Sequence, residues 1–221
     1  MKYVLTIALI TLFSFQPVKK KKVIFFGDSI TQQGAGPGGY IPKIDSLCKL
    51  DKLQDNFEFT GKGISGNRVY DLFFRFQEDV LDQQPDIVVV YVGINDVWHK
   101  TTNGTGTEYK KFGLFYDRMI TRMKAQGIQP VICTVSVIGE KNDCTNQSDG
   151  DLNLYAKWIR DYAQQNNIPL IDLRKDFAEY LLKNNPDNKE KGVLTVDGVH
   201  MNAKGNLFLA EEMWSVLKTL K

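Results

Sequence analysis

Short runs of β-branched and aromatic residues alternate along the chain with longer amphipathic stretches. The short runs predict strands, and the longer stretches predict helices. Strands are predicted over 23–27, 57–63, 86–93, 129–138 and 168–173. Helices are predicted over 40–50, 69–81, 108–126, 152–166, 177–183 and 203–220. This alternation is typical of strand-helix-strand units around a parallel sheet, here with five strands.

Three of the predicted strands, 23–27, 86–93 and 129–138, are almost continuously apolar. Strands of a parallel sheet have such sequences because helices cover both of their faces. In the predicted helix 108–126, apolar residues recur at three- and four-residue spacing, so one face of this helix belongs to the core. A chain of 221 residues, of which 43% are hydrophobic, can bury one sizeable core. We therefore expect one α/β domain that binds ligands where the carboxyl ends of its strands meet.

The first residues have the pattern of an export signal. A basic start precedes an apolar run from Val4 to Phe15, which is short for a bilayer span. Against this interpretation, no Ala-x-Ala cleavage motif is present, and Lys19 to Lys22 place positive charge where it opposes translocation. We predict a signal peptide over 1–18 and one domain over 19–221. The mature protein is then periplasmic or secreted without a stable membrane span, or cytoplasmic if the segment is not a functional signal.

Charge and cysteine content argue against several classes of function. The net charge is +2, with 28 basic and 26 acidic residues, which leaves no excess field to attract a phosphate backbone. Two histidines and three cysteines without Cys-x-x-Cys spacing cannot assemble a structural zinc or iron-sulfur site. Cys133 and Cys144 can close a disulfide loop in an oxidising compartment, although three unreactive thiols are the simpler interpretation. No nucleic acid, metal or cofactor is therefore expected.

The segment VIFFGDSITQQG, residues 23–34, places Ser29 two residues beyond the end of a predicted strand. A serine hydroxyl is a weak nucleophile until a neighbouring base takes its proton. The histidines of the chain are His99 and His200. Asp197 precedes His200 by three residues, so its carboxylate can orient the imidazole and stabilise the protonated form. Because this spacing is common by chance, a helix-capping Asp197 beside a surface histidine is the alternative.

Two further positions can donate hydrogen bonds to a developing oxyanion at the same strand edge. Gly66 follows the second predicted strand and offers a backbone N–H, while Asn95 follows the third and offers a side-chain amide. Each has a simpler explanation, since glycine permits a positive φ and asparagine satisfies turns. Asp96 is expected to brace the loop after the third strand. Trp98 and His99 on that loop are candidates for substrate contact, and an exposed loop histidine is an equal alternative for His99.

Four segments, GDSIT, GISGN, GIND and DGVH, follow one another along the chain. Together they resemble the blocks of the SGNH hydrolases, also called the GDSL esterase and lipase family, over about residues 23–217. The resemblance implies a flavodoxin-like, three-layer α/β/α sandwich whose serine attacks an ester carbonyl. The residues that it implies are a triad of Ser29, Asp197 and His200 and an oxyanion hole formed by Ser29, Gly66 and Asn95.

Competing motifs are incomplete. GAGPGG, residues 34–39, matches the dinucleotide-binding fingerprint, but six residues separate it from the strand and Pro37 interrupts it. Thr31 stands where the nucleophile elbow of α/β-hydrolases needs glycine. We expect a serine ester hydrolase that acts on acetyl or short-acyl esters of small molecules or glycans, including carbohydrate O-acetyl esters. Lysophospholipase or thioesterase activity is the alternative within the family, and a non-catalytic binding protein on the same fold is the alternative from another class.

Overall fold

The computed structural model describes residues 19–221, so the predicted signal peptide lies outside the described residues. Five parallel strands form one sheet in the order β2-β1-β3-β4-β5. The strands are β1 (Lys21–Gly27), β2 (Phe57–Gly63), β3 (Ile87–Tyr91), β4 (Gln129–Cys133) and β5 (Leu170–Ile171). This is the strand order of flavodoxin-like, doubly wound folds, in which ligands bind beside the carboxyl ends of β1 and β3. The predicted fold class is confirmed.

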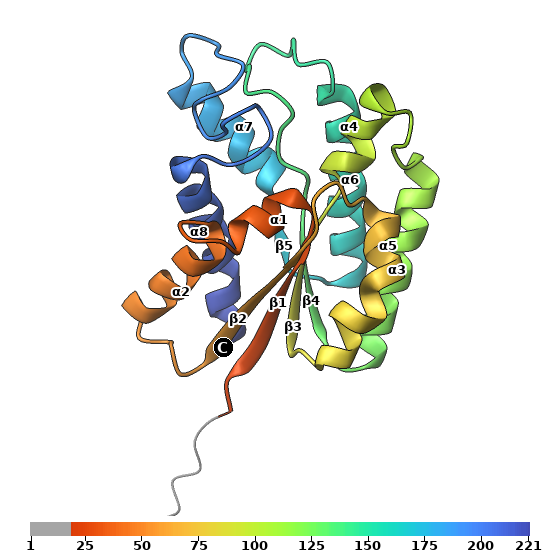
Figure 1. Ribbon diagram of the computed structural model, residues 1–221, viewed down its shortest axis with the longest axis vertical. Coiled ribbons are helices and arrows are strands. Elements are labelled where there is room, and N and C mark those ends of the chain that lie inside the picture. Colours follow the sequence, from red (N-terminus) through yellow and green to blue (C-terminus); the bar gives the residue numbers. More distant parts are fainter. Residues whose placement is uncertain (1–18) are drawn as a thin grey trace, which may run out of the picture.

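Helices cover both faces of the sheet (Figure 1). They are α1 (Ser29–Gly34), α2 (Tyr40–Leu50), α3 (Val69–Asp79), α4 (Ile94–Thr102), α5 (Tyr109–Ala125), α6 (Asp149–Asn166), α7 (Leu173–Asn184) and α8 (Ala203–Leu217), with 3₁₀ turns η1 (Leu81–Gln83) and η2 (Lys218–Leu220). α2 and α8 pack together on one face of the sheet, and α3 and α5 pack on the other. Ring contacts place α7 beside α8, through Phe177 and Phe208, and α6 beside α5, through Phe112 and Trp158. The strands between these layers are mostly buried, which accounts for their apolar sequences.

Parts of the chain differ from the sequence prediction. α1 and α4 replace the expected loops after β1 and β3, and with 6 and 9 residues they are too short to show a clear helical repeat. The predicted strand 129–138 ends at Cys133, the last residue that pairs with β5. Val135 and Val137 beyond it are buried outside the sheet. Their apolar character therefore reflects burial and not strand pairing.

The carboxyl ends of β1, β2 and β3 lie side by side. Gly27, the last residue of β1, is opposite Gly63 of β2 and Tyr91 of β3. A Cβ at Gly27 would lie 2.4 Å from the Tyr91 carbonyl oxygen, so a larger residue does not fit without a shift of the backbone. The turns after these strands carry several of the predicted site residues. The register of the sheet therefore brings these residues to one edge.

The three cysteines are free thiols, so no disulfide joins Cys133 and Cys144. Burial raises the pKa of the Cys133 thiol, which disfavours its ionisation. Within residues 19–221, no helix combines the length and the apolar character needed to cross a membrane.

Candidate active site

Ser29 is the first residue of α1, where the chain turns from β1 into the helix. Asp28 caps this helix, because its Oδ1 accepts a 2.9 Å hydrogen bond from the Ile30 N–H. Burial raises the pKa of the Asp28 carboxyl to about 6, although the Ile30 hydrogen bond and the nearby His200 and Arg75 charges lower it. The Ser29 residue is only 6% exposed. This short turn therefore fixes the serine at the carboxyl edge of the sheet.

A continuous hydrogen-bonded chain connects Ser29, His200 and Asp197. Ser29 Oγ lies 2.9 Å from His200 Nε2, and His200 Nδ1 lies 2.7 Å from Asp197 Oδ2. The other Asp197 oxygen accepts the Val199 and His200 N–H groups at 2.9 and 2.8 Å. Partial burial opposes the ionisation of Asp197, but the hydrogen bonds from His200 and Val199 hold the pKa of the carboxyl below its usual value. An ionised Asp197 orients the imidazole so that Nε2 can accept the Ser29 proton.

The loop that carries Asp197 is held by a residue that the sequence analysis did not identify. Glu140, in the loop after β4, is fully buried. Its carboxylate accepts the N–H groups of the three successive residues 193–195, at 2.7, 2.6 and 2.6 Å. The signal in the sequence is a glutamate two residues after the apolar run 129–138, because a buried charge at that position needs hydrogen-bond partners. Glu140 thus fixes the backbone up to two residues before Asp197.

Asn95 and the loop that contains Gly66 are bonded to each other. Asn95 is the second residue of α4 and is 3% exposed. Its Nδ2 donates to the Asn67 carbonyl at 3.0 Å, which joins α4 to the loop between β2 and α3. Gly66 in this loop has a φ of +78°, a value that favours glycine. A Cβ at Gly66 would have no atom of the described residues within 4 Å, so the loop borders open space.

The Gly66 loop is also tied to the turn of Ser29. The Ile64 N–H donates to the Gly27 carbonyl at 3.3 Å. The Ser65 N–H donates to Oε1 of Gln32, a residue of α1, at 2.8 Å. These bonds bring the Ser29, Gly66 and Asn95 segments together at one edge of the sheet, next to the hydrogen-bonded chain.

Asp96 lies on α4 and not in the expected loop. Both of its carboxylate oxygens lie 3.1 Å from the Val69 nitrogen, whose N–H they accept at the start of α3. Asp96 is fully buried, and this burial raises the pKa of its carboxyl to about 7. The Val69 hydrogen bond opposes this increase, and the negative charge of Asp28 adds to it. Asp96 therefore braces one helix against another.

Trp98 and His99 also lie on α4, so their expected place in a loop is wrong. Trp98 lines a cavity of about 370 Å³ together with Asp197 and Val199. Burial and the nearby Arg68 charge hold the pKa of His99 below its usual value. The structure thus places Trp98 close to the hydrogen-bonded chain. That either residue contacts substrate stays a prediction.

The arrangement matches the requirements of acyl transfer. A hydroxyl, an imidazole and a carboxylate in sequence can form and hydrolyse an ester of the serine, if nearby N–H groups stabilise the oxyanion. Over residues 19–221, no group of three or more His, Cys, Asp and Glu side chains is placed to hold a metal ion.

Comparison with known proteins identifies the family. The sequence model of the GDSL-like lipase/acylhydrolase family matches residues 25–207. An acetylxylan esterase from Geobacillus stearothermophilus is 29% identical over 208 residues, which are 86% of this chain and 90% of that protein. The crystal structure of the acetyl xylan esterase AlAXEase shares 52% sequence identity with a TM-score of 0.86, over 88% of this chain and 98% of that one. The chain belongs to the GDSL-like lipase/acylhydrolase family, as its motifs predict, and is a carboxylic ester hydrolase.

Proposed function

We propose that this hydrolase removes acetyl or other short acyl groups from carbohydrates, with Ser29 as the nucleophile. The observation that carries the proposal is the hydrogen-bonded chain from Ser29 through His200 to Asp197, with distances of 2.9 and 2.7 Å. The similarity to two acetylxylan esterases supports an acetylated xylan or a related glycan as the substrate.

The mechanism follows from the geometry of the triad. His200 Nε2 takes the Ser29 proton while Oγ attacks the ester carbonyl carbon. When the tetrahedral intermediate collapses, the bond from the acyl carbon to the sugar oxygen breaks. The protonated His200 gives its proton to this oxygen, which leaves as a hydroxyl group, and the acyl group remains on Ser29. His200 then deprotonates a water molecule, which attacks the acyl-enzyme. When this second intermediate collapses, the protonated His200 returns the proton to Ser29 Oγ, and the carboxylic acid leaves. In both steps Asp197 stabilises the imidazolium.

We assign the oxyanion hole to the backbone N–H groups of Ser29 and Gly66 and the side-chain amide of Asn95. An amide nitrogen has two hydrogens. The bond to the Asn67 carbonyl occupies one and orients the amide, which leaves the second for the oxyanion. Donors fixed in this way stabilise the developing charge without reorganising during the reaction.

The cavity beside Asp197 supports a sugar as the leaving group. Trp98 contributes an aromatic surface to this cavity. The polar residues that line it, besides Asp197, are Thr101, Thr102, Lys141, Thr145, Asn146, Gln147, Ser148 and Glu190. Polar side chains around an aromatic surface suit a sugar ring, whose C–H faces pack on an aromatic side chain while its hydroxyls form hydrogen bonds. Trp98 would then contact the substrate.

Hydrolysis of acetyl, butyryl and octanoyl aryl esters, and acetate release from acetylated xylo-oligosaccharides, test the proposal. We expect the acetyl ester and the oligosaccharide to be preferred. Ser29→Ala should lower kcat by more than about 10³-fold. Ser46→Ala, at an exposed serine of α2, is the matched control and should be fully active. Preference for the octanoyl ester would contradict the proposed short acyl group of the substrate. Activity in Ser29→Ala would contradict the proposed role of Ser29 as the nucleophile.

We also propose that the protein is exported. The apolar run near the amino terminus supports this location. A further relative, the uncharacterized lipoprotein YqeF of Bacillus subtilis (strain 168), is 27% identical over 83% of this chain and 84% of that protein. Fractionation of cells that express the full chain, or the chain without residues 1–18, tests the proposal. Equal retention of both forms in the cytoplasm would contradict it.

A further inference from the structure

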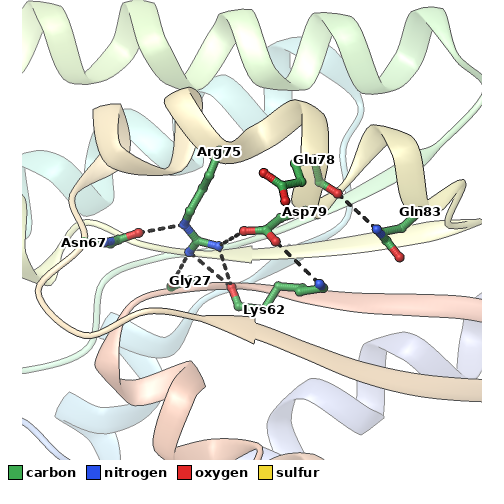
Figure 2. Close-up of polar contacts among 7 residues, drawn as sticks. All are labelled: Gly27, Lys62, Asn67, Arg75, Glu78, Asp79 and Gln83. Carbon is green, nitrogen blue, oxygen red and sulfur yellow. Dashed lines mark hydrogen bonds and ion pairs between the residues drawn. The ribbon is translucent and has the colours of Figure 1, made fainter.

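The side chain of Arg75 extends from α3 toward the carboxyl ends of β1 and β2 (Figure 2). Arg75 Nε donates to Asn67 Oδ1 at 2.7 Å. Nη2 donates to the Gly27 carbonyl at 2.7 Å, and both terminal nitrogens donate to the Lys62 carbonyl at 3.2 Å. The guanidinium also stacks on Phe26, 4.5 Å from the ring centre. One side chain thus joins the ends of two strands and the loop after β2.

Asp79, one turn further along α3, holds the guanidinium in place. Its Oδ2 accepts a 2.6 Å bond from Arg75 Nη1, and its Oδ1 lies 3.4 Å from Lys62 Nζ. The Arg75 side chain is only 15% exposed. With this bond, all five N–H groups of the guanidinium have acceptors, and their planar arrangement cannot be reproduced by the single nitrogen of a lysine.

The segments that Arg75 joins are those that carry the proposed oxyanion donors. Gly27 precedes Ser29 by two residues. Asn67 directly follows the glycine of the proposed oxyanion hole, and its carbonyl orients the Asn95 amide. The guanidinium therefore contacts the backbone two residues before Ser29. It also contacts the side chain of Asn67, the residue that follows Gly66 and accepts the Asn95 amide.

We propose that Arg75 is a positioning residue that preorganises the oxyanion hole; this inference rests on the proposed function, because it requires those donors to bind the oxyanion. Stabilisation of the oxyanion depends on donors held within about 0.5 Å of the productive geometry. Without the guanidinium, the backbone of Asn67 keeps a 3.3 Å contact from its N–H to the Ile64 carbonyl and the 3.0 Å bond from the Asn95 amide to its own carbonyl, but its side chain loses its anchor. The two bonds from Ile64 and Ser65 to the Ser29 turn remain, so the Gly66 loop stays attached at its start but loses the contact that fixes Asn67, the acceptor of the Asn95 amide.

Kinetics of Arg75→Met and Asn67→Ala on an aryl acetate test this inference, at a temperature below the unfolding midpoint of each variant. Arg75→Met should lower kcat by about 10- to 10²-fold with KM within about 3-fold, because the lost interaction acts in the transition state. Arg75→Lys should recover only part of kcat. Asn67→Ala keeps the guanidinium and should lower kcat by a smaller factor, which leaves a test if Arg75→Met does not fold. Unchanged kcat in these variants would overturn the inference.

Combining Arg75→Met with Asn95→Ala distinguishes the positioning role of Arg75 from the proposed oxyanion hole itself. If Arg75 acts through the oxyanion donors, Arg75→Met should lower kcat much less in the Asn95→Ala background than in the parent. If the fold losses of kcat in the two single variants multiply in the double variant, the two residues act independently. This result would overturn the inference and leave the proposed function intact. If Asn95→Ala alone leaves kcat unchanged, the proposed role of Asn95 in the oxyanion hole is wrong.

Arg122→Met is the matched control for loss of an arginine. Arg122 lies on α5, donates to Gln77 Oε1 at 2.6 Å and stacks on Phe76, 5.2 Å from the ring centre. It resembles Arg75 in its aromatic contact but has no bond to the proposed site. Its kcat should equal that of the parent. An equal loss of kcat in Arg75→Met and Arg122→Met would assign the effect to general packing and overturn the inference.

Discussion

Replacement of Glu140 by glutamine tests whether the loop of the proposed triad depends on one buried carboxylate. In the structure, Oε1 accepts the Leu194 and Thr195 N–H groups at 2.6 Å each, and Oε2 accepts the Val193 N–H at 2.7 Å. Glutamine retains one carbonyl oxygen for the first two bonds. Its NH₂ group must then face the Val193 N–H, so that two donors oppose each other.

The expected loss of stability can be worked out from these contacts. A hydrogen bond to a charged group contributes about 1.5–3 kcal/mol, and a buried donor without an acceptor costs about 1–3 kcal/mol. Removal of the charge also removes the cost of burying a carboxylate, which offsets part of this loss. We therefore expect Glu140→Gln to lower the free energy of unfolding by about 2–4 kcal/mol. Glu140→Ala leaves all three N–H groups without the carboxylate and should lower it further. Equilibrium unfolding in urea measures both changes.

The same substitution should also slow the reaction. The three N–H bonds end two residues before Asp197, so a displaced loop moves Asp197 and His200 away from Ser29. We expect a lower kcat for an aryl acetate with little change in KM. The control is Glu179→Gln, on the surface of α7, where the side chain is 59% exposed and pairs with a lysine at 3.8 Å. If stability and kcat of Glu140→Gln match those of this control, the reasoning is refuted.

Three further substitutions test other parts of the site. Asn95→Ala should lower kcat by about 10²- to 10³-fold, because one oxyanion donor is lost; a normal kcat in steady-state assays would remove Asn95 from this role. Trp98→Ala should raise KM for an acetylated xylo-oligosaccharide by about 10-fold and leave KM for an aryl acetate nearly unchanged; equal changes for both substrates would argue against a sugar contact. Burial raises the pKa of Asp96 from 3.8 to about 7, so the folded state binds this proton more tightly than the unfolded state. The resulting stabilisation is complete below about pH 4 and is lost as pH rises through about 7. The free energy of unfolding of the parent, measured in urea from pH 4 to 8, should therefore fall by up to about 4 kcal/mol relative to that of Asp96→Asn, which retains an oxygen for the Val69 N–H. A difference in unfolding free energy between the two proteins that is constant with pH would contradict the raised pKa of Asp96.

Elements with a clear period and clear ends could be predicted from the sequence. The predicted ranges 40–50 and 57–63 coincide with α2 and β2. The predicted helix 177–183 begins four residues late. One residue separates α7 from the two-residue strand β5, and the predicted strand 168–173 includes the first residue of this helix. Short segments at strand ends are the least predictable, since they contain too few residues for a period to emerge.

The triad and its supports differ in how far the sequence indicates them. Ser29 and His200 are 171 positions apart, and they were paired because the motifs follow a family order. Spacing alone left a capping role for Asp197 open. Arg75 and Glu140 belong to no motif, and their decisive partners are 48 and 53 or more positions away. A charged residue has many surface positions available to it, so nothing in the sequence indicates that Arg75 is held inside, and only the position of Glu140 close behind an apolar run indicates its burial.

Arg75 and Glu140 solve the same physical problem with opposite charges. The hydrogen-bond ladder of a sheet stops at its strand ends, and the loops beyond it contain backbone groups without regular partners. Arg75 donates to two backbone carbonyls there, and Glu140 accepts three backbone N–H groups. A buried ion is costly to desolvate, so it is a poor means of adding stability. A buried ion does fix several backbone groups in one geometry. The donors and the base of an active site must stay within fractions of an ångström of their productive positions, so the site needs this restraint more than it needs added stability.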